Sequence, residues 1–95
     1  MQTKAEKYEE LDRSGDKLAL IKAALASSEI IINGKPFRPE RPVRSEELSD
    51  LLNASLGLPG QKARFEFDDG SWLEVTIVSK SGRGAGTAWL ECGRL

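Results

Sequence analysis

Residues 62–80, KARFEFDDGSWLEVTIVSK, constrain the fold more than any other part of the chain. Two runs rich in β-forming residues flank an Asp-Asp-Gly turn, which is typical of a β-hairpin. A two-residue loop would mix charged and apolar side chains on both faces, whereas a three-residue loop that ends at Gly70 gathers the apolar ones on one face. In that register the opposed apolar pairs are Phe65 with Leu73 and Ala63 with Val75.

The other face of this hairpin carries a tryptophan. Trp72 follows the turn, and the three-residue loop directs it away from the apolar face. Residues 87–93, TAWLECG, alternate in the same way and predict a third strand with Trp89 on the side of Trp72. Because tryptophan is enriched at binding hot spots, this face is a candidate protein-binding site. Its expected residues are Trp72, Trp89, Arg64, Glu66 and Glu74.

A second interpretation of the two tryptophans stays open. A helix at residues 3–13 or a strand at residues 30–32 could cover their face of the sheet, and both rings would then belong to the core.

Three segments carry helical patterns. Residues 1–14 hold good helix formers but few apolar anchors, which predicts a frayed helix. Residues 16–27 predict a second helix, with the Asp16 side chain accepting hydrogen bonds at its start. Residues 45–56 follow an i, i+3, i+4, i+7 apolar stripe and predict the clearest helix, which Gly57 is expected to end in the left-handed conformation.

The remaining segments complete a prediction of fold class. The three isoleucines within residues 29–33 favour a short additional strand, and the prolines of residues 35–44 favour an extended connector. We therefore expect a single α+β domain over residues 1–95. It has two or three helices followed by a three-stranded antiparallel β-meander.

The composition disfavours several functions. The 95 residues include no histidine and a single cysteine, so the usual general base, a zinc site and an internal disulfide are not expected. Fourteen basic and fifteen acidic residues give a net charge of −1 and no global attraction to nucleic acid or membrane. We expect a cytoplasmic protein with neither enzymatic activity nor a cofactor or metal.

These observations favour a non-catalytic protein-binding module that occupies a partner's surface. In size alone the chain is similar to the small inhibitors and accessory factors encoded by phages and mobile elements. Self-association through an edge strand is a weaker possibility. The alternative is nucleic-acid binding, in which cations contact phosphates and an aromatic ring stacks on a base. Its candidate residues are Lys35, Phe37, Arg38, Arg41, Arg44 and Arg83.

Overall fold

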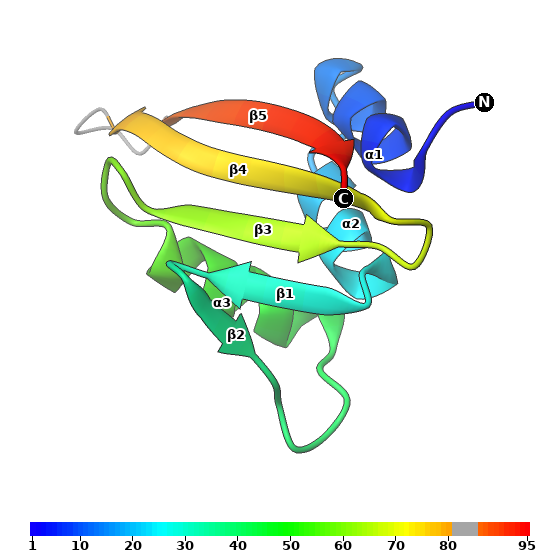
Figure 1. Cartoon of the computed structure of the whole chain (residues 1–95). Coiled ribbons are helices and arrows are strands. Elements are labelled where there is room, and N and C mark those ends of the chain that lie inside the picture. Colours follow the sequence, from blue (N-terminus) through cyan, green and yellow to red (C-terminus); the bar gives the residue numbers. More distant parts are fainter. Residues whose placement is uncertain (81–85) are drawn as a thin grey trace.

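The fold is α+β, as the sequence predicts: the residues that the structure describes form three helices and a five-stranded antiparallel sheet (Figure 1). The computed structural model describes residues 1–80 and 86–95. The strand order is β2-β1-β3-β4-β5, and α2 and α3 lie behind the sheet in the view of Figure 1. The elements are α1 (Lys4–Arg13), α2 (Ala19–Ala26), β1 (Glu29–Ile32), β2 (Lys35–Phe37), α3 (Ser45–Ser55), β3 (Lys62–Glu66), β4 (Ser71–Lys80) and β5 (Gly86–Arg94).

The hairpin of β3 and β4 has the predicted register. Phe65 pairs with Leu73 and Ala63 with Val75, and all four side chains are buried. The turn includes Gly70 at φ +84°, a left-handed conformation that glycine adopts at little cost. The choice of a three-residue loop is confirmed.

Strand β5 extends the meander on the other side of β4. Leu90 pairs with Val75 and Cys92 with Leu73, so both lie on the core face. Trp89 pairs with Thr76 and therefore shares the opposite face with Trp72, as predicted. The register shifts by a bulge between Ile77 and Ser79.

The sheet is larger than the predicted three-stranded meander. Strand β1 pairs with β3, where Ile30 faces Phe65, and β2 adds a further edge strand after a turn at Asn33 and Gly34. The first residues of the expected 35–44 connector are thus part of the sheet. Pro36 is tolerated there because an edge strand need not donate on its outer side.

The N-terminal helix is tied to the hairpin turn. The backbone N–H of Lys4 donates to Asp69 Oδ2 at 2.8 Å, and the N–H of Ala5 donates to Ser71 Oγ at 3.2 Å. These bonds satisfy donors of the first helical turn, which have no partner inside a helix. The Tyr8 ring stacks on Phe67 with centroids 5.7 Å apart, so α1 packs on the core face.

The other two helices depart from the predictions at their ends. Helix α2 begins at Ala19 rather than Asp16, because the Asp16 carboxylate binds the N–H of Leu18 in a turn that precedes the helix. After α3, Gly57 is not left-handed, and the positive φ of +88° falls at Gly60 instead.

The core lies between the sheet and the helices. Leu48 and Leu52 of α3 and small alanines of α1 and α2 pack over the buried side chains of β3 and β4. No helix among residues 1–80 and 86–95 is long and apolar enough to cross a membrane. The buried cluster consists of Ala5, Ala23, Ala24, Leu48, Leu52, Ala63, Phe65, Phe67, Leu73 and Val75.

Candidate functional site

One face of the sheet is left uncovered by the three described helices, and Figure 1 looks onto it. We call it the open face. Directly opposed residues of an antiparallel ladder point to the same side, so the registers define its members. Its central part is three rows across β3, β4 and β5: Lys62, Thr76 and Trp89; Arg64, Glu74 and Glu91; and Glu66, Trp72 and Gly93. Strand β1 adds Glu29 and Ile31.

Trp89 is the most accessible large aromatic side chain on the open face, with 59% of its surface exposed. Its indole Nε1–H donates to Glu91 Oε1 at 2.8 Å, which holds the ring along β5. Tryptophan supplies a large contact area with few rotatable bonds. A partner that covered this ring would therefore gain apolar contact at a small cost in side-chain entropy.

Trp72, in contrast, is half-buried by its own neighbours. The guanidinium of Arg64 lies 4.4 Å from the centre of the indole, within the range of a cation–π contact. The ring is also close to Gly93, where an added Cβ would lie 2.7 Å from Trp72 Cζ2. The ring therefore has a defined place on the face and is not part of the main core.

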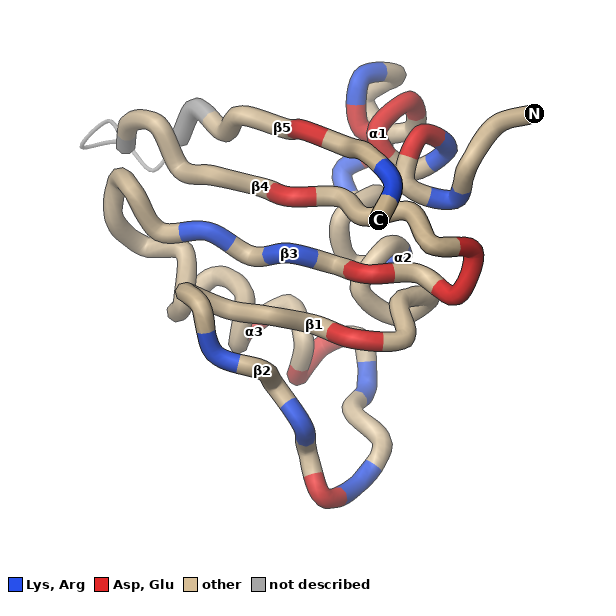
Figure 2. The backbone as a smooth tube through the Cα atoms, in the orientation of Figure 1, with Lys and Arg blue, Asp and Glu red and all other residues tan. Residues whose placement is uncertain are grey.

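The open face is acidic. Its strand residues include four glutamates and two cations, and acidic positions of β4 and β5 lie side by side (Figure 2). Glu74 stands directly opposite Glu91, an unfavourable arrangement of like charges. Arg64 forms ion pairs with two of the glutamates: its Nε lies 3.1 Å from Glu66, and its Nη1 lies 3.9 Å from Glu74.

The three arginines of the basic 35–44 segment form ion pairs at the surface, and their side chains remain largely exposed. Arg38 pairs with Glu29 at 3.0 Å, and Arg41 and Arg44 both pair with Glu47. The contact with Arg41 and, to a smaller extent, the contact with Arg44 lower the pKa of Glu47. Lys35 is exposed at the edge strand β2.

The aromatic ring of this segment has a structural role. Phe37 is partly buried and packs against the core cluster, so its ring is not presented for stacking on a base. Arg83, the last of the nucleic-acid candidates, lies outside the described residues.

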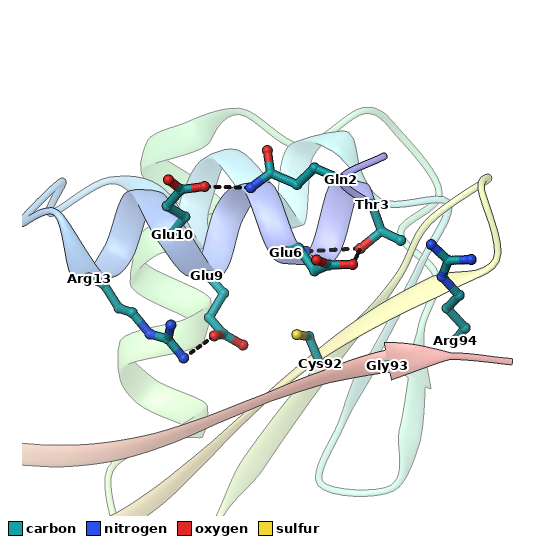
Figure 3. Close-up of a pocket in the computed structure, with 9 residues that line it drawn as sticks. All are labelled: Gln2, Thr3, Glu6, Glu9, Glu10, Arg13, Cys92, Gly93 and Arg94. Carbon is teal, nitrogen blue, oxygen red and sulfur yellow. Dashed lines mark hydrogen bonds and ion pairs between the residues drawn. The ribbon is translucent and has the colours of Figure 1, made fainter.

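A cleft of about 490 Å³ separates α1 from β5 (Figure 3). The Cys92 thiol points into it on the side of Glu9, which pairs with Arg13. The Glu9 carboxylate and partial burial raise the pKa of Cys92 to about 11. The thiol is therefore protonated near neutral pH, a state in which cysteine is a poor nucleophile. Over the described residues, no group of three or more potential ligands is placed to hold a metal ion.

The structure brings together all five predicted residues of the protein-binding face. The prediction missed Glu91, although its spacing from Trp89 in TAWLECG already places both on one side of a strand. It also missed Glu29 and Ile31. No local signal places them there, because their position depends on the pairing of β1 with the distant strand β3.

Comparisons of the chain with protein-family models, with curated proteins and with solved structures found no match.

Proposed function

We propose that this chain is a non-catalytic protein-binding module and that the open face is its contact surface. The observation that carries the proposal is the exposed ring of Trp89 on a sheet face that the described helices leave uncovered. Half-buried Trp72 and Ile31 extend the apolar part of the same face. Bound there, the module would act as an inhibitor or accessory factor by occupying its partner's surface.

The partner we propose is a protein whose contact surface presents cations beside apolar groups. The strand residues of the open face include four glutamates and two cations, and Arg38 pairs with one of the glutamates. The remaining acidic charge attracts such a surface, and complementary charge favours both the rate and the specificity of association. The exposed indole of Trp89 would be the apolar anchor, with the glutamates as a polar rim.

The chemistry of the side chains supports a binding role over a catalytic one. The sequence has no histidine to serve as a general base near neutral pH. The thiol of Cys92, with a pKa raised to about 11, is held in its unreactive form.

The test is capture of partners from a lysate of the native host, with tagged wild-type protein and two variants in parallel. Trp89→Ala removes the anchor of the open face. Leu18→Ala is the matched control, because Leu18 is also 59% exposed but lies at the start of α2, on the helix side of the sheet. Circular dichroism and melting temperature establish that each variant is folded.

We expect a stoichiometric protein that survives nuclease treatment, is lost with Trp89→Ala and is retained with Leu18→Ala. Equal capture by wild type and folded Trp89→Ala would refute the open face as the contact surface. Recovery that disappears with nuclease would point to nucleic acid instead.

A further inference from the structure

On the open face, neighbouring side chains already bind one guanidinium group, that of Arg64. Arg64 stacks on Trp72, 4.4 Å from the ring centre, while its Nε binds Glu66 Oε2 at 3.1 Å. Glu66 is the residue directly opposite Trp72, so one indole and two nearby carboxylates, those of Glu66 and Glu74, surround one arginine.

The second tryptophan stands in a similar setting. Trp89 is exposed, its Nε1–H holds Glu91 Oε1, and Glu91 lies directly opposite Glu74. Among the described residues, the cation–π contacts are those of Arg64 on Trp72 and of Lys7 on Tyr8, the latter on α1. The indole of Trp89 is thus bound to one carboxylate, that of Glu91, and shares its face with a second, that of Glu74 opposite Glu91.

The distribution of charges on the sheet also favours a cation near Trp89. Two pairs of glutamates face each other across strands: Glu29 with Glu66, and Glu74 with Glu91. The first pair is compensated by close ion pairs with Arg38 at 3.0 Å and Arg64 at 3.1 Å. At the second pair, Arg64 Nη1 approaches Glu74 only to 3.9 Å. A cation beside Glu91 would relieve the repulsion that remains.

We propose that Trp89, Glu91 and Glu74 form a binding position for an arginine side chain of a partner protein. The inference rests on the proposed function and specifies the chemistry of the partner at its anchor point. The guanidinium stacks on the exposed face of the Trp89 indole and donates to the carboxylates of Glu91 and Glu74. The indole engages one oxygen of Glu91, and a carboxylate can accept further bonds at the other.

Arginine fits this position better than lysine. Its guanidinium is planar, stacks on aromatic faces and presents several donors in one plane, whereas the lysine ammonium is a strongly hydrated point charge. The arrangement at Trp72 uses these properties of Arg64, with stacking and carboxylate binding by a single group. Trp89, Glu91 and Glu74 offer the same chemical groups, an indole and two carboxylates, in a different arrangement along the strands.

The direct test is an NMR titration of the ¹⁵N-labelled full chain, followed at the two indole Nε1–H signals. The probes are N-acetyl-L-arginine methylamide and its lysine counterpart, at matched ionic strength and up to about 50 mM, because one side chain binds weakly. Trp72 is the control within the same molecule, since Arg64 already lies on its ring. Trp89→Phe assigns the two signals.

We expect the arginine probe to shift the Trp89 signal and to leave that of Trp72 nearly unchanged, with a smaller effect of the lysine probe. Glu91→Gln should weaken arginine binding about threefold, the size expected of an exposed charge contact. Glu46→Gln, on α3, is the matched control and should have no effect. Equal shifts of both indoles, equal effects of arginine and lysine, or an unchanged titration in Glu91→Gln would overturn the assignment.

The two proposals fail separately. Arginine binding at Trp89, combined with partner capture that survives Trp89→Ala, would remove the proposed function and retain the arginine position. Capture that requires Trp89, combined with no arginine binding at its indole, would retain the binding module and remove the arginine position.

Discussion

Replacing Gly93 with alanine tests how tightly the open face holds Trp72. An ideal Cβ at Gly93 would lie 2.7 Å from Trp72 Cζ2 and 2.9 Å from Cε2, closer than carbon atoms can pack. A shift of the ring would disturb its contact with Arg64, whose guanidinium lies 4.4 Å from the ring centre. The substitution must therefore displace the indole, the strand or both.

Two opposing effects determine the size of the change. Overpacking of this kind costs about 1–3 kcal/mol. Alanine in place of glycine within a strand stabilises the folded state by about 0.5–1 kcal/mol, because the unfolded chain loses less backbone entropy on folding. We expect a net loss of about 0.5–2 kcal/mol in the free energy of unfolding for Gly93→Ala.

The assay is urea unfolding followed by far-ultraviolet circular dichroism, on wild type, Gly93→Ala, Trp72→Ala and the double variant. Without the indole the clash is absent, so Gly93→Ala should be neutral or stabilising, by up to about 1 kcal/mol, in the Trp72→Ala background. The interaction energy of the cycle should then be about 1–3 kcal/mol. A loss of equal size in both backgrounds would refute the contact between Trp72 and Gly93 as its origin.

Three further predictions concern the thiol, the turn and the core. With a pKa of about 11, Cys92 should react slowly with a disulfide reagent at pH 8, where about one thiol in 1,000 is ionised. Glu9→Gln removes the largest cause of that shift and should speed the reaction, whereas an unchanged rate would contradict the contact. The N–H of Lys4 and the Ser71 hydroxyl and N–H lower the pKa of Asp69 from 3.8 to about 2. Because folding depresses this pKa, the stabilisation is present above about pH 4 and is lost as the pH falls toward 2. The melting temperature of wild type should therefore fall more steeply over this range than that of Asp69→Asn, and parallel profiles would argue against the cap. Leu73→Ala empties a fully buried position and should cost about 2–5 kcal/mol in urea unfolding, and a loss below about 1 kcal/mol would contradict its place in the core.

The part of the candidate site on β3, β4 and β5 could be predicted from the sequence because it depends on neighbouring strands. Alternation at 62–80 and the length of the turn are enough to set the register, and the register assigns Trp72 to one face. The same reasoning places Trp89 on that face, since residues 87–93 alternate with the same period. The same alternation also assigns Glu91 to this face, although Glu91 is not among the predicted site residues.

Tertiary structure decided what depends on distant segments. The pairing of β1 with β3 brings Glu29 and Ile31 to the open face, and no feature near residue 30 encodes a partner that lies more than 30 residues later in the chain. The exposure of Trp89 was likewise undecided, since a helix at the N-terminus could have covered either face. The bonds from the α1 backbone to Asp69 and Ser71 direct that helix to the core side.

Local rules therefore determined which residues of β3, β4 and β5 share a face, whereas long-range packing added β1 to the sheet and determined which face is covered. Alternation and turn geometry act between residues close in sequence, where pairing costs little chain entropy. The contacts of α1 with the hairpin turn join residues more than 60 positions apart, and they form only in the assembled fold.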